Sequence, residues 1–350
     1  MADAEAYVIP TEALPAWVEG LLRRAEVVAP AVLHGGDVAY DVVDRPEQVA
    51  WDYGSSCTPL KRYLYPQTDP LLRWEQSPDG GLQVGPIYDK TERVFLAIRP
   101  CDVAGVLFLD RVFSRDLPDP YYLERRRRSA LIALACTQPE EHCFCVCADA
   151  GPFLDKGYDL QLTPLAARYL VEVGSDKGRE LLQVTRDLFA PAPPEALARR
   201  QELERETEQR FGEHTSYFAA AIRKVTFDRV PEALWADMSD RCLDCGGCAF
   251  VCPTCTCFTV VDAGSRREGV RERLWDCCLY RSFTLEASGH NPREERTDRL
   301  KARFFHKLRY QFIRELGGHG CVGCGRCVVA CLGSDHMPRV TASIRRGAMG

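Results

Sequence analysis

The sequence predicts an α+β fold in which a mixed N-terminal α/β domain precedes a largely helical C-terminal domain. Two observations predict this division. The 350-residue chain contains 18 cysteines, and none of them falls between residues 148 and 241. Short apolar runs mark the first half, whereas the residues after about 195 are rich in strong helix formers. We therefore expect a mixed α/β domain over residues 1–205 and a cysteine-rich domain over residues 206–350.

The residue pattern predicts individual strands in the first half of the chain and helices in the second. Residues 94–98 and 130–135 are short apolar runs of the kind found in buried strands. Both runs end close to a cysteine, so thiols should lie on the loops that follow these strands. Residues 195–224 contain no proline and predict a helix, as do residues 302–316, which are followed by the glycine pair Gly317 and Gly318.

The composition excludes several classes of protein. The formal net charge is -5 and the isoelectric point is about 5.9, whereas a nucleic-acid-binding domain is usually basic. No segment approaches the roughly 18–20 consecutive apolar residues of a membrane span. The acidic N-terminus is unlike a secretory signal, so we expect a cytoplasmic protein. Disulfides rarely persist in the cytoplasm, so this cysteine content predicts metal binding.

Eight of the cysteines form two runs with the same spacing. The first run is Cys242, Cys245, Cys248 and Cys252, and the second is Cys321, Cys324, Cys327 and Cys331. Both have the C-x2-C-x2-C-x3-C spacing of bacterial ferredoxins, in which three close thiolates hold one [4Fe–4S] cluster and the fourth binds the other cluster. The spacing therefore predicts two clusters in a ferredoxin-like domain.

The ferredoxin pattern also predicts that the two runs exchange their last ligands. One cluster would be held by Cys242, Cys245, Cys248 and Cys331, and the other by Cys321, Cys324, Cys327 and Cys252. The alternative is a structural zinc site, which usually takes two C-x2-C pairs separated by a longer loop. Two complete runs of four favour the clusters.

The remaining cysteines are open to two interpretations. Cys101, Cys136, Cys143 and Cys145 fall near the ends of the predicted strands and are candidates for a third cluster, or are buried or redox-active thiols. Cys255, Cys257 and Cys278 are candidates for extra metal ligands, or are buried small apolar residues. Several basic residues lie near the second run: Arg293, Arg296, Arg299, Arg303, His306, Lys307 and Arg326. They would raise the potential of a cluster or form a docking face for a partner. The alternative is that they cover a solvent-exposed helix surface.

Several of these segments, in this order, resemble a known family. They are residues 98–102 (Ile-Arg-Pro-Cys-Asp), 143–145, 252–257, 275–276 and 320–327. The set resembles the 4Fe–4S dicluster subunits of multi-subunit oxidoreductases. That family includes the beta subunit of cytoplasmic sulfhydrogenase-type [NiFe] hydrogenases and the corresponding iron–sulfur subunit of anaerobic sulfite reductase. The resemblance runs from about residue 50 to 340.

The resemblance implies a role that the residues alone do not. Subunits of this family relay electrons between a flavin subunit that handles NAD(P)H and a catalytic partner, which is the [NiFe] small and large subunits or a sirohaem subunit. Seven of the cysteines outside the two runs match cysteines that recur in the family: Cys101, Cys136, Cys143, Cys145, Cys255, Cys257 and Cys278. No residue is a convincing general acid, base or nucleophile, so we expect no catalytic residue. Three hypotheses follow: a hydrogenase relay, a sulfite reductase relay, and a zinc-stapled or redox-sensing binding module.

Overall fold

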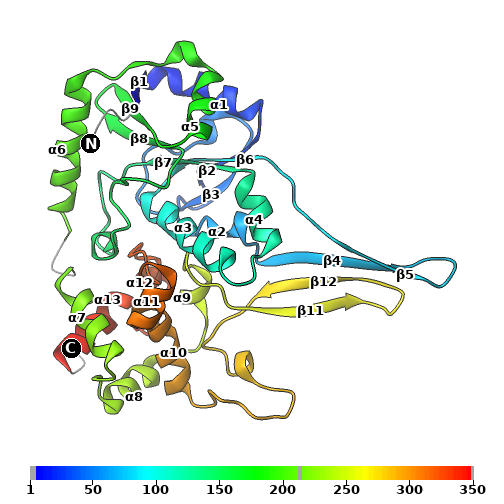
Figure 1. Cartoon of the computed structure of the whole chain (residues 1–350). Helices are drawn as coiled ribbons and strands as arrows, with labels where there is room; N and C mark the ends of the chain where they lie inside the picture. The colour runs from blue at the N-terminus through cyan, green and yellow to red at the C-terminus, as the bar shows by residue number, and fades with distance from the viewer. Residues whose placement is uncertain (1–4, 212–214, 348–350) are drawn as a thin grey trace.

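The computed structural model describes residues 5–211 and 215–347. It contains an N-terminal domain built on a large sheet, a projecting four-stranded sheet, and a C-terminal helical region (Figure 1). The predicted α+β class is therefore confirmed. Within the described residues, no helix combines the length and the apolar character needed to span a membrane.

The N-terminal domain is built around an eight-stranded mixed sheet. In spatial order its strands are β10 (Ala190–Pro191), β1 (Ala6–Pro10), β9 (Arg168–Val173), β8 (Leu160–Leu165), β7 (Ser129–Leu134), β6 (Arg93–Ile98), β2 (Glu26–Val32) and β3 (Val38–Val43). The central strands β2, β6, β7 and β8 pair in parallel, and the outer strands pair antiparallel. The two strands predicted from the sequence are β6 and β7. Every residue of β7 is buried, as expected for a parallel strand covered on both faces.

Helices cover this sheet and complete its core. They are α1 (Leu14–Leu22), α2 (Lys61–Leu64), α3 (Pro100–Ser114), α4 (Pro120–Arg127), α5 (Asp176–Gln183) and α6 (Pro194–Glu208). Figure 1 shows α1 and α5 on one side of the sheet and α3 and α4 on the other. Large side chains such as Trp17, Phe95 and Tyr122 are fully buried between these layers. Helix α3 begins two residues after β6, so it starts at the carboxyl end of a parallel strand.

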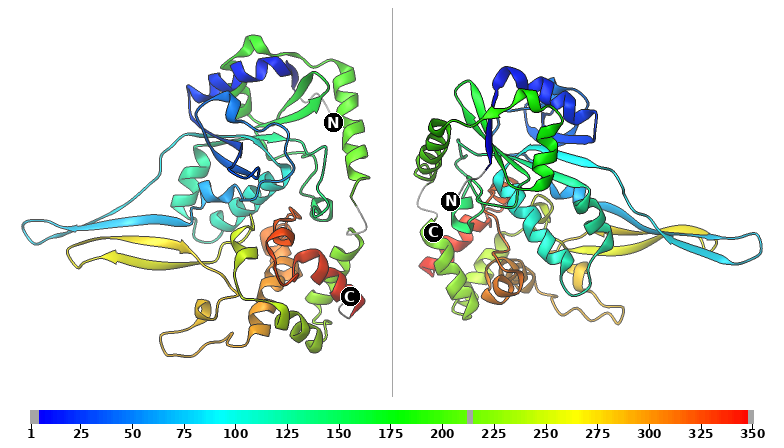
Figure 2. Two further views of the ribbon diagram at one scale, coloured as in Figure 1. Left: turned by 180° about the vertical axis from the view of Figure 1, so that it is seen from behind. Right: turned by 45° about the horizontal axis from the view of Figure 1, so that its top comes forward.

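A second sheet joins the two predicted domains. Its order is β11 (Phe258–Gly264), β12 (Glu268–Trp275), β4 (Thr68–Gln76) and β5 (Leu82–Pro86), so each half of the chain supplies two strands. This sheet, here called the arm, projects away from the body of the molecule in every view (Figures 1 and 2). A buried ion network holds its base, where Asp69 on β4 binds Arg125 of α4 and Arg273 of β12. Arg125, the first of four consecutive arginines at residues 125–128, is thus buried.

The C-terminal region is mainly helical. Its helices are α7 (Thr215–Thr226), α8 (Glu232–Arg241), α9 (Gly247–Phe250), α10 (Arg296–Leu308), α11 (Tyr310–Leu316), α12 (Arg326–Ala330) and α13 (Met337–Arg346). Helices α7 and α8 pack against α10, helix α13 packs against α7, and the short helices α9 and α12 pack against each other. A separate apolar core, which includes Trp235 and Phe304, fills the space between them.

Both predicted helices are divided in the structure. The segment 195–224 forms α6 and α7, and residues 212–214 between them lie outside the described part of the chain. The segment 302–316 breaks at Arg309, whose backbone is extended. Contacts with the end of α7 stabilise the break, because Arg309 pairs with Asp228 at 3.0 Å and the Tyr310 N–H donates to Thr226 Oγ1 at 2.9 Å. Tertiary contacts therefore override a continuous helical pattern.

Candidate metal centre

The two cysteine runs fold into loops of the same backbone conformation. In the first run Asp244 and Gly246 have positive φ values of 49° and 73°, and the matching residues of the second run, Gly323 and Gly325, have 63° and 74°. In each run the second of these residues, Gly246 or Gly325, is the N-cap of a short helix, α9 or α12. Left-handed turns between the cysteines direct successive sulfurs toward one side of the loop. The sequence repeat is therefore also a structural repeat.

Asp244 occupies a left-handed conformation that a non-glycine residue adopts only at a cost. Two arginines of α10 hold it there. Arg299 Nη2 lies 2.9 Å and Arg296 Nε lies 3.2 Å from Asp244 Oδ2. Helix α10 thus fixes the first cysteine loop from outside.

The structure brings together the first predicted set of four sulfurs. Cys242, Cys245, Cys248 and Cys331 line one small cavity. Three of them come from the first run, and the fourth comes from the second. The four side chains thus lie together, and their binding of one cluster stays a prediction.

The second set converges on Cys252. Burial is the main cause that raises the pKa of each thiol of the second run, and the charge of Cys252 raises all three further; these thiols are Cys321, Cys324 and Cys327. Cys252 itself has a lowered pKa, because the Cys255 thiol donates to its sulfur and Lys307 and Lys61 lie nearby. Because the charge of Cys252 acts on all three thiols of the second run, we infer that Cys252 lies near them.

Three buried cations surround these sulfurs. Lys61 reaches across from α2 and donates to the Cys255 carbonyl at 2.9 Å, and Lys307 Nζ lies 3.5 Å from Cys252 Sγ and 2.7 Å from Thr254 Oγ1. Arg303 is 4% exposed and lines the cavity of the first set. Its Nε and Nη1 atoms have no hydrogen-bond partner within the described residues. Burying cations and unpaired donors costs free energy unless an anion compensates them.

An anionic cluster held by these sulfurs would supply that compensation, so the residues present at both sets fit a [4Fe–4S] group. Sequence reasoning identified Arg303 and Lys307 but left open whether they lie on an exposed helix surface. The structure buries both of them, whereas His306 on the same helix is exposed. Lys61 was missed, because no local pattern links it to cysteines almost 200 residues away.

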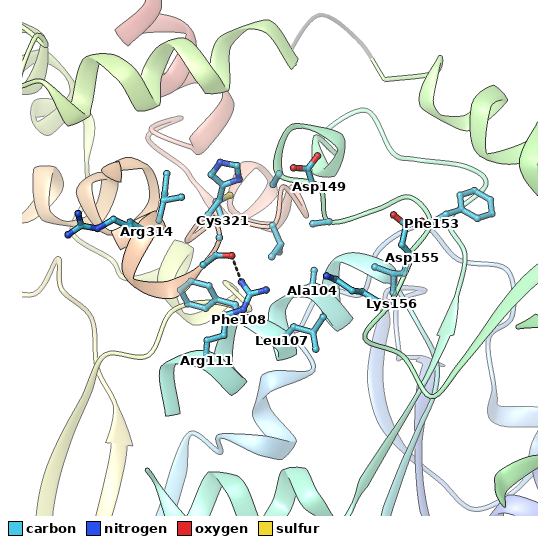
Figure 3. A pocket seen from close by; sticks show the side chains of 18 of the residues that line it. Ala104, Leu107, Phe108, Arg111, Asp149, Phe153, Asp155, Lys156, Arg314 and Cys321 are labelled. Atoms are coloured by element: carbon cyan, nitrogen blue, oxygen red, sulfur yellow. Dashed lines mark hydrogen bonds between the residues drawn. The ribbon is translucent and has the colours of Figure 1, made fainter. Parts of the chain in front are cut away.

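A cleft leads from the surface to the second set (Figure 3). It has a volume of about 560 Å³ and lies between α3, the loop after Cys147, and α11. Cys321 forms part of its wall, and the cleft carries charges of both signs from Asp149, Lys156 and Arg314. Arg111 Nη1 donates to the Gly317 carbonyl at 3.0 Å and ties α3 to the end of α11. This cleft is a route by which another molecule can approach the second set of sulfurs.

The other cysteines gather at two further places. Cys101, Cys136, Cys143 and Cys145 line one narrow cavity at the carboxyl ends of β6 and β7. Cys255, Cys257 and Cys278 line a different cavity of about 250 Å³ at the base of the arm, together with Arg303 and Lys307. Cys57 is exposed, and Cys147 lines neither cavity. The role of the second group as extra metal ligands stays a prediction.

Within the described residues, no three His, Cys, Asp or Glu side chains stand close enough to hold a single metal ion. A cubane holds its four thiolates farther apart than one tetrahedral ion does, because the iron–sulfide core lies between them. The sets of four sulfurs are therefore candidate sites for iron–sulfur clusters and not for single metal ions.

Comparison with known proteins agrees with this geometry. Residues 241–334 match the model of the 4Fe–4S dicluster domain family. The whole chain is similar to Sulfhydrogenase 2 subunit beta of Pyrococcus furiosus, with 30% identity over 339 residues, which cover 96% of this chain and 97% of the relative. The chain belongs to the sulfhydrogenase beta-subunit family. The family assignment confirms the resemblance found in the sequence, and the dicluster domain supports two iron–sulfur clusters in the C-terminal part.

Proposed function

We propose that this chain is a cytoplasmic electron relay in a hydrogenase-type complex. In this proposal it passes single electrons between a flavin subunit that handles NAD(P)H and the small and large subunits of a [NiFe] catalytic module. The observation that carries the proposal is that Cys331 of the second run lines one cavity with the first three cysteines of the first run. When bound, two [4Fe–4S] clusters at these sets supply reversible one-electron storage.

The protein's own residues prepare the site for this role. Left-handed turns hold the cysteine loops, α10 fixes the first loop through Asp244, and the buried cations Arg303 and Lys307 favour a more negative cluster. A cation beside a cluster stabilises the reduced state and so raises its potential. The name of the Pyrococcus furiosus relative supports the hydrogenase assignment over a sulfite reductase complex.

The test is purification of the complex from the native host through a tag on this chain. The proposal predicts co-purified nickel and H₂-dependent reduction of NAD(P)⁺ and of an artificial dye. Sirohaem absorbance without nickel would instead identify a sulfite reductase relay, and a colourless zinc protein would identify a binding module. Either of these results would contradict the hydrogenase proposal.

A substitution of one buried cysteine distinguishes loss of electron transfer from loss of complex assembly. Cys248→Ser should leave the complex intact and retain dye reduction at the catalytic module, but should abolish transfer from H₂ to NAD(P)⁺. Cys57→Ser is the matched control, because Cys57 is exposed and belongs to none of the sulfur sets. Unchanged NAD(P)⁺ reduction by the Cys248→Ser complex would refute the relay.

A further inference from the structure

A second group of cysteines meets at the edge of the N-terminal sheet. Cys101 follows β6 and Cys136 follows β7, and these two strands are parallel neighbours. Cys143 and Cys145 come from the loop that continues from β7. Sites in open α/β sheets form at the carboxyl ends of parallel strands, where loops from different strands meet. The topology therefore brings residues distant in sequence to one point.

A local irregularity in β6 contributes to this convergence. The register between β6 and β7 shifts after Phe95, and Ala97 has a positive φ of 55°. The hydroxyl of Tyr53 donates to the Ala97 carbonyl at 2.7 Å and holds this bulge. Bulges redirect the chain, and strained backbone is kept mainly at functional sites. Here the bulge lies just before the segment that carries Arg99 and Cys101.

The four sulfurs enclose a cavity like that of the first dicluster set. Cys101, Cys136, Cys143 and Cys145 line it, and its volume of about 20 Å³ equals that of the cavity lined by Cys242, Cys245, Cys248 and Cys331. Gly151 lies close to one of these sulfurs, because a Cβ atom there would come within 3.4 Å of Cys145 Sγ. The site thus has these four thiols, with Cys324 of the second run at its wall, and a volume that matches the cavity of the first set.

A buried cation also lines this cavity. Arg99 is 7% exposed, and its guanidinium donates to the carbonyls of Gly54 at 2.8 Å and Ala135 at 3.3 Å. It therefore lies beside the thiols in a fixed orientation, stacked on the Tyr53 ring at 3.9 Å. Arg303 has the corresponding place beside the first dicluster set. An anionic group among the four thiols would compensate the Arg99 charge.

The loop of the second cysteine run lies directly over this cavity. The Phe144 N–H donates to the Gly323 carbonyl at 2.9 Å, and Cys324 lines the same cavity as Cys143 and Cys145. A Cβ atom at Gly323 would meet the Phe144 and Cys145 backbone at 2.4–2.6 Å, so the two loops are in close contact.

A buried ion pair locks the second run onto the N-terminal domain. Arg326 Nη2 lies 2.7 Å from Asp102 Oδ2, and Arg326 Nε donates to the Ser56 carbonyl at 2.7 Å. Asp102 follows Cys101, and Arg326 lies between Cys324 and Cys327. One ion pair therefore holds neighbours of both sulfur sets in place.

We propose that Cys101, Cys136, Cys143 and Cys145 bind a third [4Fe–4S] cluster, in direct electronic contact with the cluster at Cys321, Cys324, Cys327 and Cys252. The contact route is the Phe144–Gly323 hydrogen bond and the shared wall at Cys324. In each transfer one cluster loses the electron that the other gains, and no covalent bond changes. The transfer step rests on the proposed relay function, whereas binding of the third cluster does not.

The test is the iron and acid-labile sulfide content of the anaerobically purified full-length chain, with EPR spin quantitation after reduction. Three cubanes predict about twelve irons per chain, and two predict about eight. The variant Cys136→Ala/Cys143→Ala should lose about a third of the iron while keeping the EPR signals of the dicluster domain. Cys147→Ser is the matched control, because Cys147 lies on the same loop but outside the cavity, and it should keep the full iron content.

About eight irons in the wild-type chain would overturn the third cluster and leave the dicluster relay standing. Equal iron in the double variant and the wild type would also overturn it. A chain without iron would overturn both proposals. Because the wild-type count alone separates these outcomes, a double variant that fails to fold does not remove the test.

Discussion

Removing the charge of Lys307 should lower the potential of the cluster bound at Cys252. Lys307 is 5% exposed, and its Nζ lies 3.5 Å from Cys252 Sγ. Burial alone lowers the pKa of Lys307, but the neighbouring sulfurs of Cys252, Cys255 and Cys321 raise it above its ordinary value, so the side chain is a cation. Lys307→Met removes that charge with little change in volume.

The structure sets the size of this effect. A cluster bound at Cys252 would place the added electron beyond Sγ, so we take a separation of about 7 Å from Nζ, twice the Nζ–Sγ distance of 3.5 Å. At that separation and an effective dielectric constant of about 20, a unit charge contributes about 2.4 kcal/mol. For a one-electron couple this corresponds to a fall in potential of about 100 mV.

The assay is a redox titration of the full chain followed by EPR. Lys307→Arg keeps the charge and should restore most of the potential. Lys301→Met is the matched control, because Lys301 lies on the same helix but pairs with Glu232 and Asp298. An unchanged potential in Lys307→Met, a rise in potential, or an equal fall in Lys301→Met would refute the electrostatic account.

Three further predictions test other parts of the structure. Cys331→Ser should remove the cluster of the first run, and Cys252→Ser that of the second; EPR of each variant checks this, and the opposite assignment would show uncrossed ligands. Asp69→Ala should lower the free energy of unfolding by about 3–5 kcal/mol, because it leaves two buried arginines uncompensated. Asp262→Ala, at an exposed pair on the same arm, should cost about 0–1 kcal/mol in the same denaturation assay. Burial raises the pKa of Cys327 to about 12, so its thiol is neutral at pH 7 until iron displaces the proton. Cluster reconstitution should therefore release protons and be weaker at about pH 6 than at about pH 8.5, as iron titrations would measure.

The sequence predicted the parts of the site whose signals are local. The C-x2-C-x2-C-x3-C spacing is a property of short segments, and the structure folds both segments into matching loops. The strands β6 and β7 were found because continuous apolar runs mark buried strands. Their cysteine-bearing ends were correctly expected to lie at the edge of the sheet, where four thiols line one cavity.

Long-range features could not be predicted in the same way. Lys61 reaches Cys255 across 194 residues, and Arg326 pairs with Asp102 across 224. No periodicity in a single sequence encodes such contacts. The arm was missed for a similar reason, because two strands from each half form one sheet. The break at Arg309 depends on contacts with α7, which outweigh the helical pattern of the segment itself.

The C-terminal part should carry two [4Fe–4S] clusters that lie close enough to interact. The most direct measurement is EPR of the purified full-length chain, oxidised and then fully reduced, combined with metal analysis. The account predicts a brown protein with at least about eight irons and, on reduction, S = 1/2 signals broadened by coupling between two clusters. A colourless protein that contains zinc and gives no EPR signal after reduction would contradict it.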